Sequence, residues 1–278
     1  MKIAVLSGKG GTGKTFVAVN LAVCENTSVY LDCDVEEPNG HLFMKPENIQ
    51  KEQILTLLPS FDETKCTKCR KCVDFCRFNA LALVGKKPKV FNEVCHSCGG
   101  CSLICPSNAI SEFQKQIGVV ETGNHGNVTT VSGFLNPGEA SGIPVIKAVL
   151  NKANPNVVTI IDCPPGSACS VMESIEGSDY CILVAEPTVF GLHNFEMVYE
   201  LVSLLKKPCG VIINKSEGEY APIDDFCKQH SISILCHIPY SEELALLGAN
   251  AEIACEQVPK YKSIFSYVLR TVKAEVTK

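Results

Sequence analysis

The chain has 278 residues, of which 46% are hydrophobic and 7% aromatic, and its formal net charge at pH 7 is -5. This length and composition are those of a globular protein with one large core or two domains. The acidic balance argues against general nucleic-acid binding, and no apolar run reaches the ~18 residues of a membrane span. The first apolar segment also lacks the length and cleavage site of a signal peptide, so we expect a cytoplasmic protein.

The first predicted element is a buried strand over residues 2–7, KIAVLS, which precedes the glycine-rich loop GKGGTGKT and an apolar helix. The loop predicts phosphate binding because glycines let backbone N–H groups turn toward an anion at the helix N-terminus. Within the GxxxxGKT pattern, Lys14 is expected to reach the β- and γ-phosphates and the Thr15 hydroxyl to bind Mg²⁺. The predicted nucleotide-binding residues of the loop are Gly8, Lys9, Gly10, Gly11, Thr12, Gly13, Lys14 and Thr15.

The loop contains a second lysine, Lys9, which a phosphate-binding loop does not need. The form KGGxGKT resembles the deviant Walker A ATPases, a family that includes MinD, ParA, the nitrogenase iron protein and metal-site maturation proteins. In that family the early lysine reaches the nucleotide of the other subunit and stabilises transition-state charge, as an arginine finger does. The resemblance implies a homodimer that forms on ATP binding, in which Lys9 and Lys14 are both catalytic. The alternative is that Lys9 is a solvated loop residue.

Three later motifs resemble further parts of the same family. In VYLDCDVEEPNG, residues 29–40, the resemblance to switch I implies that Asp34 orients the attacking water near Mg²⁺, with Asp32 in support. In VVTIIDCPPG, residues 157–166, it implies that Asp162 is the Walker B aspartate, also at the metal. In GVIINK, it implies that Asn214 reads adenine, with Lys215 beside it. Aspartates also cap helices, and Asn and Lys are ordinary turn residues, so these alternatives stay open.

The chain has 17 cysteines, and eight of them fall in the two runs CTKCRKCVDFC and CHSCGGCSLICP. In a cytosolic protein such cysteines do not imply disulfides, so their spacing decides. Each run is CxxCxxCxxxC, which resembles a bacterial-type ferredoxin with two [4Fe–4S] clusters, in which the fourth cysteine of each run binds the other cluster. The implied ligand sets are Cys66, Cys69, Cys72 and Cys105 for one cluster, and Cys95, Cys98, Cys101 and Cys76 for the second. Zinc is the alternative, although tandem runs of this spacing do not suit a Cys₄ zinc site.

Cys169 is singled out among the other cysteines because it follows Asp162 at the offset at which the nitrogenase iron protein places a cluster ligand. A bridging metal site there would need a second ligand, and no other CxxC occurs outside the two runs. We therefore favour an inert thiol at Cys169.

The two cysteine runs lie between switch I and the Walker B motif, which predicts an insertion. We expect a first part of the ATPase domain at 1–57, an inserted ferredoxin domain at 58–113 and the second part of the ATPase domain at 114–278. After the insertion, a hairpin around GNHGN is followed by strands that alternate with helices. This alternation predicts an α/β fold with a doubly wound, mostly parallel sheet, to which a small α+β ferredoxin domain is added. The last segment has one apolar stripe, typical of a helix packed on its own domain, so membrane binding is not expected.

Three interpretations of the function follow from the resemblance to ferredoxin-containing MinD-type ATPases. The first is an ATPase whose nucleotide-driven dimer switch is coupled to electron transfer through two [4Fe–4S] clusters. The second is an assembly or carrier ATPase that passes a cluster to an apoprotein. The third is a ParA-like positioning ATPase with structural or sensory clusters. The first two imply a protein redox partner or an apoprotein partner, and all three imply ATP and Mg²⁺.

Overall fold

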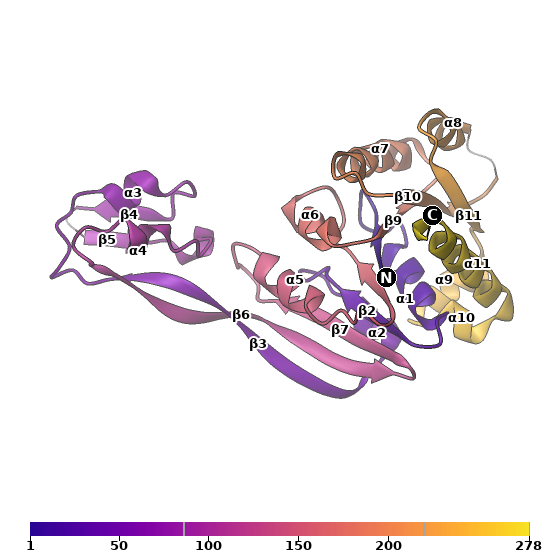
Figure 1. Ribbon diagram of the computed structural model, residues 1–278, viewed down its shortest axis with the longest axis horizontal. Coiled ribbons are helices and arrows are strands. Elements are labelled where there is room, and N and C mark those ends of the chain that lie inside the picture. Colours follow the sequence, from indigo (N-terminus) through magenta and orange to yellow (C-terminus); the bar gives the residue numbers. More distant parts are fainter. Residues whose placement is uncertain (86, 219–220, 278) are drawn as a thin grey trace.

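The computed structural model describes residues 1–85, 87–218 and 221–277, and it has an α/β body from which a long two-stranded ribbon reaches a small lobe (Figure 1). Within the described residues the body contains a nine-stranded sheet of order β11-β10-β9-β1-β8-β2-β7-β6-β3. The strands are β1 (Lys2–Leu6), β2 (Ser28–Asp32), β3 (Glu47–Phe61), β6 (Ile110–His125), β7 (Val128–Leu135), β8 (Val158–Asp162), β9 (Tyr180–Ala185), β10 (Cys209–Ser216) and β11 (Ser233–Pro239).

The sheet is mostly parallel, as the sequence predicted. Neighbouring strands are parallel from β11 through to β7, and only the β7–β6 and β6–β3 pairs are antiparallel. The central strands β1, β2, β8 and β9 are buried along almost their whole length. Their apolar runs without alternation therefore arise because both faces of the sheet are covered.

Helices cover the two faces of the sheet with separate hydrophobic cores. On one face α1 (Lys14–Val23), α2 (Gly40–Met44), α10 (Ala254–Gln257) and α11 (Pro259–Val276) contribute to a core that includes Leu21 and Phe265. On the other face α5 (Ile143–Leu150), α6 (Cys169–Glu176), α7 (Val189–Leu204) and α8 (Ala221–Gln229) contribute to a core that includes Ile146 and Val198. A further helix, α9 (Glu242–Ala249), precedes α10.

The predicted apolar stripe of the last segment packs against the body. Val268, Leu269 and Val272 of α11 are buried, and Phe265 contacts Phe16 of α1 edge to face. Among the helices of the described residues, none combines the length and the apolar character that a membrane crossing requires.

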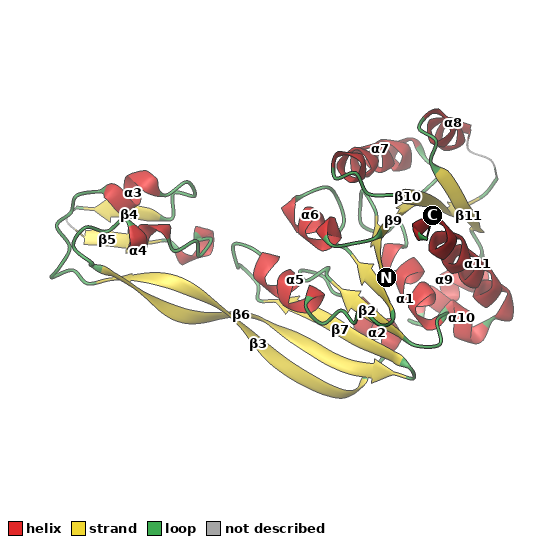
Figure 2. Ribbon diagram, viewed as in Figure 1, coloured by secondary structure: helices red, strands yellow, loops and turns green. Residues whose placement is uncertain are grey.

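The lobe is joined to the body by continuous strands. β3 and β6 pair from Glu47 opposite Asn124 to Phe61 opposite Ile110, and Figure 2 shows them as one uninterrupted ribbon. The lobe contains α3 (Lys71–Phe75), the hairpin β4 (Leu81–Val84) and β5 (Lys87–Val90), a 3-10 turn at Asn92–Val94 and α4 (Gly100–Leu103). The predicted domain edges near 58 and 113 lie at this ribbon, and the division of the chain into domains stays a prediction.

Candidate functional site

The glycine-rich loop connects β1 to α1 at the carboxyl edge of the sheet, and two of its glycines are required by close contacts. Gly13 has a left-handed φ of 90°, and a Cβ there would lie 2.2 Å from Nδ2 of Asn214. A Cβ at Gly8 would lie 2.1 Å from the carbonyl oxygen of Asn194. Any other residue at Gly13 would therefore meet both a strained backbone and a neighbouring side chain.

Lys14 is buried between two of the aspartates that the sequence predicted. Its Nζ lies 2.6 Å from Oδ1 of Asp162 and 3.6 Å from Oδ2 of Asp34. These residues converge because β8 lies between β1 and β2 in the sheet. The three strands are parallel to one another, so their carboxyl ends meet at the same edge. Burial opposes the charged form of Lys14, but the carboxylates of Asp162 and Asp34 outweigh burial and raise the pKa of Lys14.

Asp32 and Tyr30 support this cluster from β2. The Asp32 carboxylate accepts hydrogen bonds from the backbone N–H groups of Gly40 at 2.9 Å and Asp34 at 3.2 Å, which fixes the loop after β2. The Tyr30 hydroxyl donates to Oδ2 of Asp162 at 2.9 Å. Burial raises the pKa of Asp34 to about 6, although Lys14 opposes the shift. The sequence offered no signal for Tyr30, because its partner lies 132 positions along the chain.

Lys9 is paired with a carboxylate that sequence reasoning did not single out. Oε2 of Glu186 lies 2.7 Å from Nζ of Lys9, and Oε1 of Glu186 lies 2.6 Å from Nζ of Lys215. Lys215 also donates to the carbonyl oxygen of Gly11 at 2.7 Å. Burial favours the neutral form of Glu186, but the two lysines outweigh it and lower the pKa of that carboxyl group. The available signal was the segment YCILVAEPT, in which Glu186 directly follows a buried strand, much as Asp162 ends one.

Asn214 contacts the phosphate-binding loop in this structure. Its side-chain amide donates to the carbonyl oxygen of Thr12 at 2.7 Å, and Asn214 is almost fully buried. Next to it, Lys215, Glu186 and Tyr240 are among the residues that line a cavity of about 450 Å³. The cavity has room for a nucleobase beside the loop. The role of Asn214 in reading adenine stays a prediction.

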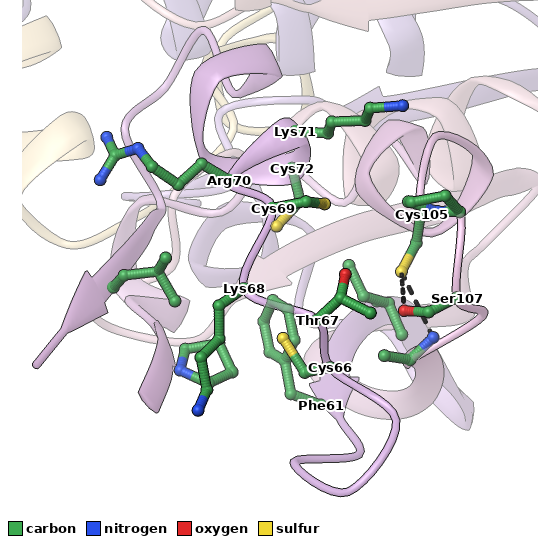
Figure 3. Close-up of a pocket in the computed structure, with 15 residues that line it drawn as sticks. Phe61, Cys66, Thr67, Lys68, Cys69, Arg70, Lys71, Cys72, Cys105 and Ser107 are labelled. Atoms are coloured by element: carbon green, nitrogen blue, oxygen red, sulfur yellow. Dashed lines mark hydrogen bonds between the residues drawn. The ribbon is translucent and has the colours of Figure 1, made fainter. Parts of the chain in front are cut away.

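The eight cysteines of the lobe are arranged in the two sets that the sequence predicted. One cavity is lined by Cys66, Cys69, Cys72 and Cys105 (Figure 3). A second cavity in the lobe is lined by Cys76, Cys95, Cys98 and Cys101. Over the described residues, no three His, Cys, Asp or Glu side chains lie close enough to hold one metal ion, and the two iron–sulfur clusters stay a prediction.

The chemistry of each cavity nevertheless fits a four-iron cluster. A single ion needs sulfurs about 2.3 Å from one point, whereas a four-iron cluster is itself an eight-atom body that lies between its cysteines. The fourth cysteine of each run accepts a backbone N–H: Cys76 from Ala80 at 3.4 Å and Cys105 from Ala109 at 3.3 Å. Such N–H to sulfur contacts are typical of cluster thiolates.

The backbone of the lobe repeats with an offset of 29 residues, from Cys66 to Cys95. Three left-handed positions of the first run recur in the second; the pairs are Lys68 and Ser97, Arg70 and Gly99, and Asn79 and Asn108. Left-handed non-glycine residues cost energy and are enriched at functional sites. Their recurrence indicates two copies of one cysteine-presenting loop.

The surroundings of the two cysteine sets differ. Lys68, Arg70 and Lys71 line the cavity of the first set (Figure 3). The second cavity is lined by Phe75 and Phe78 and also by Arg77, His96 and Glu112. Outside the lobe, Cys169 begins α6 and is exposed, and the inert thiol expected there stays a prediction.

The CobQ/CobB/MinD/ParA nucleotide binding domain family matches residues 3–253 of the chain. The chain belongs to this family. An uncharacterized protein of Methanocaldococcus jannaschii is 28% identical over 94% of this chain and 92% of that protein. An uncharacterized ATP-binding protein of the same organism is 25% identical over 97% of this chain and 98% of that protein. Among solved structures, the septum site-determining protein MinD from Pyrococcus horikoshii, complexed with Mg-ADP, has a TM-score of 0.59 and 17% identity over 98% of this chain and 95% of MinD.

The family match and the structural likeness confirm the predicted α/β P-loop fold. The solved structure is too distant in sequence to show more than the fold. The glycine-rich loop, Lys14, Asp34 and Asp162 converge as the sequence predicted, whereas their individual roles stay predictions.

Proposed function

We propose that the protein hydrolyses Mg-ATP and forms a homodimer when ATP is bound. The observation that carries this proposal is the position of Lys14, buried between Asp162 and Asp34 at 2.6 and 3.6 Å. A cation between two acids at the carboxyl edge of a parallel sheet provides groups for both phosphate and metal binding. One relative is described as an ATP-binding protein, and the similar MinD structure contains Mg-ADP. Both support an adenine nucleotide with Mg²⁺ as the ligand here.

In this proposal each residue has a defined task. Lys14 neutralises the terminal phosphates, Asp34 orients the attacking water, and Lys9 stabilises transition-state charge on the nucleotide of the other subunit. Thr15, Asp34 and Asp162 would hold Mg²⁺, which neutralises phosphate charge when bound. Asp32 acts indirectly, because its two backbone hydrogen bonds position the loop that contains Asp34.

The test is the nucleotide dependence of the oligomeric state. We expect the purified chain to be monomeric with ADP and dimeric with Mg²⁺ and a non-hydrolysable ATP analogue, as measured by sedimentation velocity. The rate of ATP hydrolysis per chain should rise with protein concentration, because the active species is the dimer. The dimer switch would be contradicted if the chain stays monomeric and hydrolyses ATP at a rate per chain that does not depend on protein concentration.

Among the three interpretations of the task of this ATPase, the comparisons support the positioning ATPase best. The structural likeness is to a septum site-determining protein, and the family includes ParA. The positioning interpretation requires only the dimer switch of the body. It leaves the cysteines of the lobe with a structural or sensory task.

A second candidate function is electron transfer through the lobe, and a specific observation favours it. The eight cysteines line two cavities, four to each, in the pairing expected of two clusters. Two [4Fe–4S] groups would supply one-electron transfer when bound. Cys66, Cys69, Cys72 and Cys105 would hold one, and Cys76, Cys95, Cys98 and Cys101 the other. The cations at Lys68, Arg70 and Lys71 would favour an acidic protein partner at the first cavity.

The metal content of anaerobically purified protein tests the second candidate. We expect about eight iron atoms and about eight acid-labile sulfides per chain. Zinc without sulfide would contradict the cluster proposal and leave the ATPase proposal intact. Rates of cluster reduction that depend on ATP would support electron transfer over positioning, and rapid loss of the clusters to a mild chelator would support delivery to an apoprotein.

A further inference from the structure

Two cysteines outside the lobe are in direct contact. Cys24 follows the last turn of α1, and Cys255 lies in α10, near the other end of the chain. Their sulfur atoms are 3.3 Å apart. Neither residue belongs to the nucleotide site or to the cysteine sets of the lobe, so the functions proposed above leave this pair unexplained.

The two cysteines are held in place by hydrogen bonds to one buried asparagine and by a neighbouring ion pair. The backbone N–H of Cys255 donates to Oδ1 of Asn20 at 2.8 Å, and Asn20 is fully buried within α1. The backbone N–H of Cys24 donates to the carbonyl oxygen of the same Asn20 at 3.2 Å. Next to Cys24, Glu25 forms an ion pair with Lys273 of α11. One buried asparagine therefore fixes both cysteine backbones relative to each other.

The two thiols differ in their access to solvent and in their chemistry. Cys24 is half-buried, whereas Cys255 is 6% exposed. The contact between the two thiols lowers the pKa of Cys24, and Ser266 and Lys262 add to this effect. The same contact and burial raise the pKa of Cys255. An oxidant in solution therefore meets Cys24 first, as the more thiolate-like of the two sulfurs.

We propose that Cys24 and Cys255 form a reversible intramolecular disulfide when the protein is exposed to a small disulfide oxidant such as oxidised glutathione. The Cys24 thiolate attacks one sulfur of the oxidant and expels one glutathione thiolate, which leaves a mixed disulfide on Cys24. Cys255 then gives its proton to the expelled glutathione thiolate, attacks the sulfur of Cys24 and expels the second glutathione as a thiolate, which takes up a proton from water. Two protein thiols are oxidised, and one oxidised glutathione is reduced to two molecules of glutathione.

The disulfide would join the end of α1 to the C-terminal helices and close a loop between residues 231 positions apart. Closing a long loop restricts the unfolded chain, so the oxidised protein should melt roughly 5 °C or more above the reduced protein. The phosphate-binding loop lies at the opposite end of the ten-residue α1, about 15 Å away. ATP affinity should therefore change by less than about two-fold.

Peptide mapping of the full chain tests the proposal. Anaerobically purified protein is incubated with oxidised glutathione, its free thiols are blocked during denaturation, and unreduced peptides are identified by mass spectrometry. We expect a peptide that joins Cys24 to Cys255 and that dithiothreitol separates. Cys255→Ser should trap Cys24 as its glutathione adduct, whereas Cys24→Ser should leave the buried Cys255 unmodified. Cys169→Ser is the matched control, because it removes an exposed thiol and should leave the cross-link unchanged.

The wild-type map decides the outcome even if a variant fails to fold. Recovery of Cys24 as a free thiol, at oxidant concentrations that modify the exposed Cys169, would overturn the proposal. A cross-link from Cys24 to any cysteine other than Cys255 would overturn it as well. Mapping also separates this disulfide from any that form among the eight cysteines of the lobe.

Discussion

Lys9 and Lys14 belong to one loop, yet the structure gives them different surroundings. Lys14 is buried against Asp162, whereas the side chain of Lys9 is 37% exposed and its partner Glu186 lines the cavity of about 450 Å³. A buried lysine with two acids beside it suits a phosphate in its own subunit. A half-exposed lysine is free to reach another molecule once its ion pair breaks.

Replacement of the two lysines should therefore have different effects. Lys14→Ala should abolish nucleotide binding, because the phosphates lose the buried cation of the loop. Lys9→Ala should bind ATP with nearly unchanged affinity and hydrolyse it at least ~10³-fold more slowly, since the lost charge acts on the transition state. Isothermal titration and steady-state turnover measure the two effects separately.

Mixed dimers show whether Lys9 acts across the interface. In a heterodimer of Lys9→Ala with Asp34→Ala, one site keeps its aspartate and receives Lys9 from the other chain. That heterodimer should recover about half of the wild-type turnover per dimer, although each parent homodimer is inactive. No recovery would mean that Lys9 acts in its own subunit.

In the nucleotide-free monomer, the ion pair with Glu186 should keep Lys9 from reaching a second subunit. Glu186→Gln removes the charge that binds Lys9, so the analogue concentration needed for half-maximal dimerisation should fall. Because the Lys9 side chain is partly exposed, we expect a shift of only about two- to five-fold. Lys215→Gln is the control, since it breaks the other ion pair of Glu186 and leaves the pair with Lys9. An equal shift in both variants would mean that the cavity lined by Glu186 and Lys215, and not the release of Lys9, causes the change.

At the scale of single elements, the phosphate-binding loop is the part that the sequence predicted best. Its glycines and lysines form a pattern within eight consecutive residues, so a short segment was enough to place the loop between β1 and α1. Glu186 and Tyr30 could not be assigned in this way, because their partners are distant in sequence and are fixed only by strand order. Lys9 meets Glu186 because β1 and β9 are neighbours in the sheet.

The ribbon of β3 and β6 was also hard to predict. Residues 47–53 of β3 are exposed, so this half of the strand has no hydrophobic alternation to mark it. Pro59 lies within β3, opposite Glu112, although proline lacks the backbone N–H that a strand interior uses. β3 is the edge strand of the sheet, and an edge strand tolerates a residue that lacks a backbone N–H.

Two glycines of the phosphate-binding loop provide a direct test of this local geometry. Gly13→Ala should lower the free energy of unfolding by about 1–2 kcal/mol or more, because φ is 90° and the new Cβ would meet Asn214. Gly10→Ala should change it by less than about 0.5 kcal/mol, since nothing lies within 4 Å of the added Cβ. Urea unfolding of both variants measures the difference. Equal losses would show that the loop does not hold Gly13 in this conformation.

At the scale of the whole molecule, hydrogen bonds connect the loop after β2 to the ribbon that supports the lobe. The carbonyl oxygen of Val35, next to Asp34, accepts from the backbone N–H of Leu135 at 2.8 Å. The following residue, Asn136, donates its backbone N–H to Ile117 of β6 at 2.8 Å. Three residues later, Glu139 forms an ion pair with Lys115 of the ribbon at 2.8 Å. The segment 135–139 therefore joins the predicted switch I to the base of the ribbon.

This connection bears on the choice between an electron-transfer protein and a positioning ATPase. If nucleotide binding moves Asp34, the movement reaches β6 through segment 135–139 and the paired strands, with no flexible linker between them. The same continuous ribbon would carry a small rotation at its base to the lobe as a rigid body. A lobe that responds to nucleotide is needed for gated electron transfer, whereas structural clusters need no such response.

Hydrogen–deuterium exchange tests the connection without relying on cluster activity. With Mg²⁺ and a non-hydrolysable ATP analogue, compared with ADP, we expect altered exchange at residues 34–36, at 135–139 and in the lobe-proximal half of β6. Glu139→Gln, which removes the ion pair with Lys115, should reduce the response in β6 and leave that at 34–36 unchanged. Glu121→Gln breaks the ribbon's own ion pair with Lys51 at 2.6 Å, away from segment 135–139, and should preserve the full response. If exchange changes at 34–36 while the ribbon of the wild-type chain stays unaffected, the lobe does not sense nucleotide through this path. The positioning ATPase with structural clusters would then be the better account of the molecule.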